Sequence, residues 1–324
     1  MENREVVEKF KATFIMPVHN EAGIITNALK SLEPLLKKYG YQLIIGLDAC
    51  TDNSRQMLEK FNNVEIIEFT QRQGKSSIIS QIYKLAQSGI IIIFDADWQL
   101  KGDIKAFDET INLLISSPNI GGIVVDIDNF NIDYKKDSFK CSFGFRGEII
   151  ASRLLREYQF LTNTYSKDGL YFSDQKKPYF PFMLNIIKKE YLKQVHTTGD
   201  DIERWLMLIN NNLEVAIFRH SSGFYFQVND IHKTLKTLLV RHLRSHLSNS
   251  KIKDNYNYKI SFSKFYIPAT FYVFKKIFQF LNIKNIFSVT MWYICSSVAY
   301  TSAKFLAVFR IPTSTLWKFR ANRS

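Results

Sequence analysis

Four aliphatic runs alternate with segments of helical spacing over the first 94 residues, and this alternation constrains the fold more than any other feature of the chain. The runs cover residues 13–18, 42–47, 64–69 and 90–94. The segments between them cover residues 24–36, 51–61 and 76–87. Nearly continuous apolar strands joined by helices are typical of a parallel sheet that is buried on both faces. We therefore predict an α/β fold with a mostly parallel sheet and helices on both of its faces.

Further elements are expected beyond residue 100, with a less regular pattern. The spacing predicts a helix over 104–116, a strand over 123–125, and helices over 185–195 and 202–209. Residues 130–185 carry no usable periodicity. Any part of a binding site that these residues contribute is therefore the least predictable part of the chain, because binding residues often lie on irregular loops.

Positive charge is concentrated at the C-terminal end. Residues 251–324 hold twelve Lys or Arg and one acid, a net charge of +11, which leaves +2 of the total of +13 for residues 1–250. The same segment is rich in aromatic and aliphatic residues, whereas a nucleic-acid-binding tail is usually polar. This composition favours an anionic membrane surface as the partner, and we expect no nucleic-acid partner.

Two segments near the C-terminus have patterns of membrane-associated helices. Residues 230–247 are basic and amphipathic, and residues 285–303 contain no Lys, Arg, Asp or Glu. The second segment approaches the ~20 residues that span a bilayer, but six Ser or Thr residues dilute it, so a spanning helix and an interfacial helix both stay open. We divide the chain into an α/β domain, residues 1–230, and a helical membrane-associating region, residues 231–324.

The N-terminal segment alternates charges and lacks the apolar core of a secretory signal. Three scattered cysteines also favour a reducing compartment. We therefore expect a peripheral or monotopic protein at the cytoplasmic face of the cell membrane.

Polar residues follow each of the four predicted strands. In chain order they are His19, Asn20 and Glu21, then Asp48, then Gly74 and Lys75, and finally Asp95 and Asp97. In a parallel sheet, ligands bind beyond the carboxyl ends of the strands. The four strand ends therefore predict a single binding site.

The pair Asp95 and Asp97 leaves the fourth strand into a turn, where two carboxylates can face one divalent cation that bridges a diphosphate. We predict these two residues as ligands of Mn²⁺ or Mg²⁺. The similar pair Asp126 and Asp128 also follows an aliphatic run, but it lies away from the other polar strand ends. The alternative is that either pair consists of solvated loop carboxylates.

The segments FIMPVHNEAGII, GLDACTDNS, QGKSSII and IIIFDAD resemble, in this order, the opening of family 2 glycosyltransferases of the GT-A fold. The resemblance implies a nucleotide-sugar donor, UDP- or GDP-linked, and a nucleobase contact for Asp48. Cys50 stands where a Ser is usual in that family. The donor-binding residues that the resemblance and the strand ends suggest are Pro17, His19, Asn20, Glu21, Asp48, Gly74, Lys75 and Asp95.

A second segment, NIIKKEYLKQVHTTGDDIERWLMLI, resembles the acceptor half of the same family. By that match Asp201 is the general base and Asp200 stands for the family's Glu, which implies inversion at the sugar. The alternative is that both acids only cap the following helix. Arg241 and Arg244 match the family's Q/R-x-x-R-W element in part, with Ser245 in place of Trp, and either contact the donor diphosphate or belong to an amphipathic helix.

These observations favour an inverting, metal-dependent glycosyltransferase that acts on a lipid-linked or membrane-proximal acceptor in polysaccharide or glycolipid biosynthesis. Two alternatives stay open. A membrane-attached protein would bind a nucleotide sugar without turnover. A sugar nucleotidyltransferase would need a Gly-rich, Arg-containing first loop, which PVHNEAG does not provide.

Overall fold

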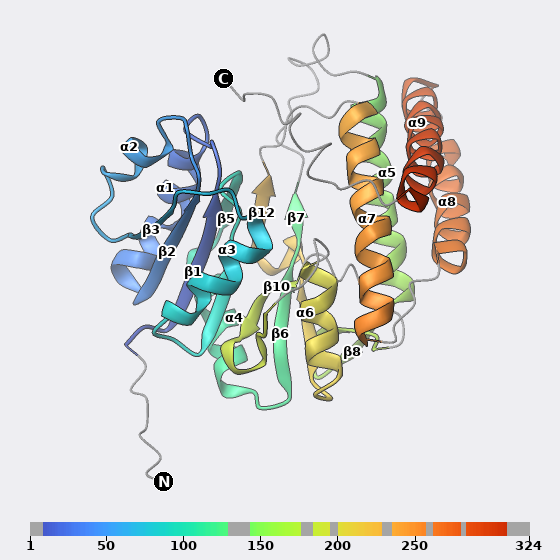
Figure 1. Ribbon diagram of the computed structural model, residues 1–324. Helices are drawn as coiled ribbons and strands as arrows, with labels where there is room; N and C mark the ends of the chain where they lie inside the picture. The colour runs from blue at the N-terminus through green and yellow to red at the C-terminus, as the bar shows by residue number, and fades with distance from the viewer. Residues whose placement is uncertain are drawn as a thin grey trace.

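The computed structural model contains a nine-stranded sheet, a three-stranded sheet and a group of long helices beside them (Figure 1). The structure describes residues 9–128, 143–175, 184–194, 200–228, 235–256, 262–279 and 283–309. The long helices lie along one side of the two sheets.

The N-terminal half of the large sheet consists of the four strands that the sequence predicts. These are β1 (Ala12–Val18), β2 (Tyr41–Asp48), β3 (Glu65–Phe69) and β4 (Ile90–Ile93). They pair in parallel in the order β3-β2-β1-β4. The carboxyl ends of all four strands therefore meet at one edge of the sheet, which we call the rim.

Three helices connect these strands. They are α1 (Ile25–Lys38), α2 (Ser54–Leu58) and α3 (Lys75–Ile82), the last followed by a 3-10 turn over Tyr83–Leu85. Helix α2 is much shorter than the predicted segment 51–61. The Asp52 carboxylate accepts hydrogen bonds from the backbone N–H groups of Ala22 and Ser54, which holds the start of that segment as a loop.

The remaining strands extend the sheet beyond β4. In spatial order they are β10 (Leu184–Lys188), β6 (Ile120–Val125), β11 (Glu214–Phe218), β9 (Leu170–Ser173) and β8 (Thr164–Lys167). Only β10 and β9 run against the others, so seven of the nine strands share one direction. The prediction of a mostly parallel sheet is confirmed.

The predicted helix over 185–195 is wrong. Residues 184–188 form β10, and only Lys189–Tyr191 are helical, as a 3-10 turn; residue 195 lies outside the described residues. Leu184, Ile186 and Ile187 are each 0% exposed because β10 lies between β4 and β6 with both faces covered. A short continuous apolar run of this kind cannot be distinguished from a buried helix by periodicity.

Helices cover both faces of the large sheet, as predicted. On one face α1 and α4 (Ile104–Ser116) pack against inward side chains such as Phe14 and Met16. On the other, α3 and α6 (Asp200–Ile209) pack against side chains such as Ile15 and Ile44. The alternation along β1 thus places successive side chains in two separate cores. The small sheet, β5 (Trp98–Gly102), β12 (Phe224–Val228) and β7 (Ile127–Asp128), borders the first core.

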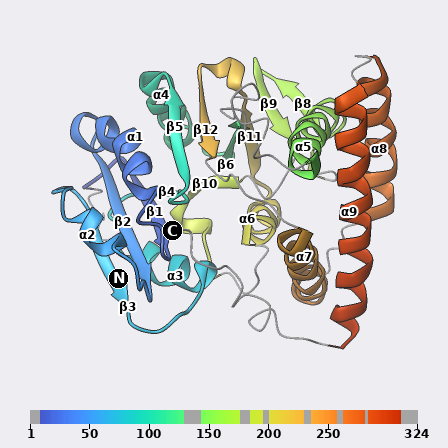
Figure 2. The ribbon, with the colours of Figure 1, turned by 90° about the horizontal axis from the view of Figure 1, so that it is seen from above.

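Four long helices form the remainder of the described chain. They are α5 (Phe143–Thr162), α7 (Leu235–Tyr256), α8 (Phe262–Gln279) and α9 (Ile283–Val308). Helices α5, α8 and α9 share a third core, and α8 and α9 lie side by side at the outer edge of the molecule (Figures 1 and 2). A Cβ on Gly147 of α5 would lie 2.0 Å from the carbonyl oxygen of Ser288, so this glycine permits the close approach of α5 to α9.

Helix α7 includes most of the predicted amphipathic segment, whose first residues lie outside the described part. Helix α5 belongs to the predicted first domain, but it shares a core with α8 and α9 of the predicted second region. This packing crosses the predicted boundary, and the division at residue 230 stays a prediction. Among the helices of the described ranges, none combines the length and the hydrophobicity needed to cross a bilayer.

Candidate functional site at the rim

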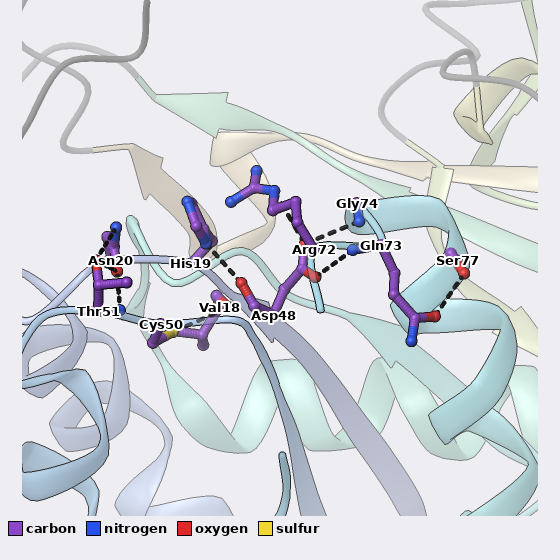
Figure 3. Close-up of polar contacts among 10 residues, drawn as sticks. All are labelled: Val18, His19, Asn20, Asp48, Cys50, Thr51, Arg72, Gln73, Gly74 and Ser77. Atoms are coloured by element: carbon purple, nitrogen blue, oxygen red, sulfur yellow. Dashed lines mark hydrogen bonds and ion pairs between the residues drawn. The ribbon is translucent and has the colours of Figure 1, made fainter. Parts of the chain in front are cut away.

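Asp48, the last residue of β2, organises the loop that follows β3. Its carboxylate accepts hydrogen bonds from the backbone N–H groups of Gln73 at 2.6 Å and Gly74 at 2.8 Å, and Arg72 Nε lies 3.3 Å away (Figure 3). Asp48 is only 3% exposed. Gly74 has φ +88° and ψ 158°, a conformation that is essentially restricted to glycine. The Asp48 carboxylate therefore fixes a backbone shape that leads directly into α3.

The loop after β1 lies beside Asp48. The His19 Nδ1 atom is 2.6 Å from the Asp48 carbonyl oxygen (Figure 3). Because a carbonyl oxygen only accepts, Nδ1 donates, and in the neutral ring Nε2 is left as an acceptor. Asn20, with φ +56°, accepts a hydrogen bond from the Thr51 N–H at 2.8 Å through its side chain. The loops after β1 and β2 are thus joined at the rim.

Pro17 and Glu21 of the predicted donor site, and the neighbouring Cys50, make contacts that join β1, β2 and the loops after them, and a donor contact of Pro17 or Glu21 stays a prediction. Pro17 lies within β1 and pairs with Gly46 of β2. The Glu21 N–H donates to Ser54 Oγ at 2.9 Å, close to the start of α1. The Cys50 thiol lies 3.5 Å from the Val18 carbonyl oxygen. The small side chain at position 50 therefore packs against the end of β1.

Lys75, the first residue of α3, pairs with Asp95 after β4. Its Nζ atom lies 2.8 Å from Oδ1 and 2.9 Å from Oδ2 of Asp95. Desolvation works to lower the pKa of Lys75, but the carboxylates of Asp95, Asp200 and Asp201 outweigh it and raise this pKa above its ordinary value. Lys75 therefore keeps its positive charge, which the three carboxylates stabilise.

Asp200 and Asp201, in the first turn of α6, are held by a buried arginine. The Arg204 side chain is 0% exposed; its Nη1 donates to Asp200 Oδ2 at 2.7 Å and its Nη2 donates to Asp201 Oδ1. Its Nε donates to the Leu184 carbonyl oxygen at 2.9 Å. One guanidinium group thus fixes both carboxylates and ties the start of α6 to β10.

The two acids differ in their electrostatic environments. Burial works to raise the pKa of Asp200, but Arg204 and Lys75 outweigh it and hold that pKa below its ordinary value. Burial and the neighbouring charge of Asp200 raise the pKa of Asp201 well above its ordinary value, with a further contribution from Asp95, against the opposing effect of Arg204 and Lys75. Asp201 is therefore the better proton acceptor of the pair.

Asp95 and Asp97 fit a cation whose coordination is completed by a substrate. Across the described ranges, no three acidic, His or Cys side chains are grouped so that they alone could hold a metal ion. Mg²⁺, however, is commonly bound by one or two carboxylates together with substrate phosphates. The Trp98 N–H donates to the Asp95 carbonyl oxygen at 3.0 Å, which closes a tight turn around Asp97. The two carboxylates at this turn match that donor set.

The structure brings together residues that are far apart in the sequence. Lys75, Asp95, Asp200 and Asp201 interact with one another, and Gly74 connects them to the Asp48 loop. Arg244 is half-buried on α7, and the side chain of Arg241 lies outside the described residues, so the role of both stays a prediction.

Sequence reasoning missed two arginines of the site. Arg204 follows Asp200 and Asp201 by four and three positions, which is the spacing of ion pairs on a helix and could have indicated it. Arg72 had no such signal, because its contact with Asp48 depends on the path of a loop.

Comparison with known proteins adds a family and a fold. The family model described as "Glycosyl transferase family 2" matches residues 13–195. The mannosyltransferase PcManGT from Pyrobaculum calidifontis, solved with GDP-Man and Mn²⁺, is 14% identical, with 97% of this chain and 82% of that chain covered and a TM-score of 0.50. Glucosyl-3-phosphoglycerate synthase from Mycobacterium tuberculosis, solved with phosphoglyceric acid, is 12% identical, with 77% of this chain and 81% of that chain covered and a TM-score of 0.50. No curated protein matches the sequence. At these identities the two solved structures are evidence for the fold.

Proposed function

The chain belongs to glycosyltransferase family 2 and is a glycosyltransferase, and from this premise we propose that it transfers a sugar with inversion, using a divalent cation and Asp201 as general base. The proposed donor is a nucleotide-diphosphate sugar. The proposed acceptor is lipid-linked or lies close to a membrane, at the cytoplasmic face. A bound sugar would then lie between the donor side of the rim and the first turn of α6.

One observation carries this proposal: Lys75 pairs with Asp95 at 2.8 Å, Arg204 pairs with Asp200 and Asp201, and the charges of these two groups influence one another's pKa. They come from α3, the end of β4 and the start of α6, and the chain between residues 95 and 200 separates the last two. Solvated carboxylates in unrelated loops would not affect one another's pKa in this way. A shared cluster of this kind supports a catalytic site.

The donor side combines a cation with a shaped backbone. Lys75 at the start of α3 supplies a positive charge for a diphosphate, and the positive end of the helix dipole adds to it. Asp48 holds the loop that precedes this helix, and the acceptor nitrogen of His19 is available to a base or ribose N–H or O–H group. That PcManGT holds GDP-Man with Mn²⁺ makes nucleotide sugars the first class of donor to test. A nucleobase contact for Asp48 and diphosphate contacts for Arg241 and Arg244 stay part of the proposal.

Asp95 and Asp97 would hold the cation, and when bound it would compensate for negative charge on the leaving diphosphate. Each carboxylate oxygen has two lone pairs, so the contact between Asp95 and Lys75 leaves positions for a metal. Two carboxylates and phosphate oxygens together meet the preference of Mn²⁺ or Mg²⁺ for oxygen ligands.

Asp201 is proposed to accept the proton of the acceptor hydroxyl. The acceptor oxygen then forms a bond to the anomeric carbon from the side opposite to the diphosphate, and the bond between that carbon and the diphosphate oxygen breaks. The configuration at the anomeric carbon is inverted. Arg204 orients Asp201, while Asp200 stays ionised as the second partner of the guanidinium.

The test is a screen of nucleotide sugars with the purified protein, with and without chelator. We expect one donor to be hydrolysed or transferred, the activity to disappear in chelator and to return with Mn²⁺ or Mg²⁺, and the product to have the opposite anomeric configuration by NMR. Full activity in chelator would contradict the metal assignment. Donor binding without any turnover would instead identify a binding protein.

A further inference from the structure

Large exposed apolar side chains are concentrated on α8 and α9. Ten of the fifteen in the described residues lie on these two helices or directly after α9, and each is exposed by half or more. They are Ile267, Phe271, Phe278, Ile283, Phe287, Ile294, Val298, Phe305, Val308 and Phe309, which we call the outer apolar face. Single exposed apolar residues are ordinary on a protein surface, but a group of this size marks a binding surface.

On α9 these residues form one continuous stripe. Residues 283, 287, 294, 298 and 305 are separated by steps of four and seven, which places them on the same side of a helix. The opposite side is packed: Val289 and Ala303 are 0% exposed, and α9 contacts α5 and α7 there. At 1.5 Å per residue, the 22 steps from Ile283 to Phe305 give a stripe of roughly 33 Å on the 26-residue helix. The stripe therefore faces away from the body of the protein along the whole helix.

Helix α8 continues the same surface. Its Ala269, Val273 and Ile277 are buried in the core that it shares with α5 and α9. Ile267 and Phe271, by contrast, are 57% and 74% exposed. Because α8 and α9 both pack on α5 and lie side by side at the edge of the molecule (Figure 2), their exposed sides together face outward.

Charge identifies what covers this surface. Residues 255–324 contain ten Lys or Arg and no Asp or Glu. Two copies of the chain that met through this face would bring the exposed cations Lys275 and Lys304 of both copies close together, and these charges would repel each other. An anionic lipid surface would neutralise the same charges while it buried the apolar side chains. Charge complementarity thus favours lipid over a second copy.

We propose that the outer apolar face lies in the interface of an anionic bilayer, with α8 and α9 flat on the membrane. The stripe occupies one side of α9 only, and none of the described helices could span a bilayer, so this attachment is interfacial. Lys275 and Lys304, both exposed, lie at head-group level beside the inserted rings. This inference deepens the membrane-proximal acceptor of the proposed function, but attachment itself does not depend on sugar transfer.

The test is flotation of the full chain with vesicles, in the absence of donor and acceptor. One set of vesicles contains phosphatidylglycerol and phosphatidylcholine, and the other contains phosphatidylcholine alone. The test variant combines Phe271→Ser, Phe287→Ser and Phe305→Ser. The control variant combines Ile115→Ser, Leu161→Ser and Tyr171→Ser, which changes three exposed side chains away from the outer apolar face.

We expect the wild type and the control variant to float with the anionic vesicles, more weakly at high salt, and the test variant to bind about 100-fold less tightly. Donor affinity should be the same in all three. Absence of flotation of the wild type, or equal flotation of the test variant, would overturn the inference. So would self-association of the wild type in solution that the test variant loses. A wild type that floats but transfers no sugar would refute only the proposed function.

Discussion

Replacement of Arg204 by Met tests how the buried charges at the start of α6 are held. The variant keeps an apolar side chain of similar length but leaves Asp200 and Asp201 without their guanidinium partner. Removal of one partner of a buried ion pair costs about 3–5 kcal/mol of stability. Arg204 and Asp200 have side chains that are 0% and 8% exposed, but Asp201 is 21% exposed and can recover some hydration. We therefore expect a loss of about 3 kcal/mol at neutral pH.

This loss depends on pH, because it arises from ionised carboxylates. Arg204 lowers the pKa of Asp200, so this contact stabilises the fold above the pKa of an unfolded Asp, about 3.9, and the stabilisation is lost as the pH falls through the folded value. In acid, both carboxylates are neutral and need no cation. The difference in stability between the wild type and Arg204→Met should therefore shrink as the pH is lowered.

Denaturant unfolding at neutral and acidic pH measures this difference, and the pH dependence of kcat/KM measures the effect on catalysis. Without Arg204 the pKa of Asp201 rises further, so the ascending limb of the pH profile should move to higher pH. Lys11→Met is a matched control, because it breaks the 2.6 Å ion pair between Lys11 and Asp108. Lys11 directly precedes β1 and therefore lies at the end of that strand opposite to the rim. It should lower stability but leave the pH profile unchanged. An equal loss of stability at both pH values, with an unshifted profile, would refute the reasoning.

Three further predictions concern the same site. In the wild type, kcat/KM should rise with pH above the range in which carboxylates ordinarily titrate, because Asp201 has a raised pKa and must be ionised to act, and a flat rate profile would count against Asp201 as the base. The folded chain keeps the Asp201 proton to higher pH than the unfolded chain does, so the free energy of unfolding should fall as the pH rises from the unfolded to the folded pKa. Lys75→Met should weaken donor binding about 10- to 100-fold by calorimetry, whereas Lys84→Met, an exposed control, should not; equal affinities would exclude a donor contact. Gly74→Ala should weaken donor binding and lower stability by about 1–3 kcal/mol, because Ala is strained at φ +88°, whereas Gly23→Ala should have little effect on either; a Gly74→Ala variant with normal donor affinity would argue against the loop.

The parallel half of the sheet was predictable because buried parallel strands consist of almost uninterrupted aliphatic residues. The strands that contain Ile45 and Ile92 have no polar residues at the spacing that would suggest a helix. The same property caused the error at β10, where a short apolar run after an irregular segment matched a helix equally well. Helix α5 was missed because its apolar residues face α8 and α9, more than a hundred positions later in the chain.

At the site, the sequence indicated the acids but not how they are held. Asp95, Asp200 and Asp201 were found from their motifs, and the structure brings them into one cluster. The contacts of Asp48 with two backbone N–H groups could not be predicted, because backbone direction in a loop leaves no signature in residue type. The complete burial of Arg204 could not be predicted either, because it depends on the position of β10 beside α6.

The most direct test of the account is the substitution Asp201→Asn, measured for both donor affinity and sugar transfer. The side chain keeps its size and an oxygen acceptor for Arg204 but can no longer take a proton. We expect the dissociation constant for the nucleotide sugar to stay within about twofold, while transfer in a single turnover falls by about 10²- to 10⁴-fold. Transfer at the wild-type rate would contradict the assignment of Asp201 and, with it, the catalytic site proposed at the rim.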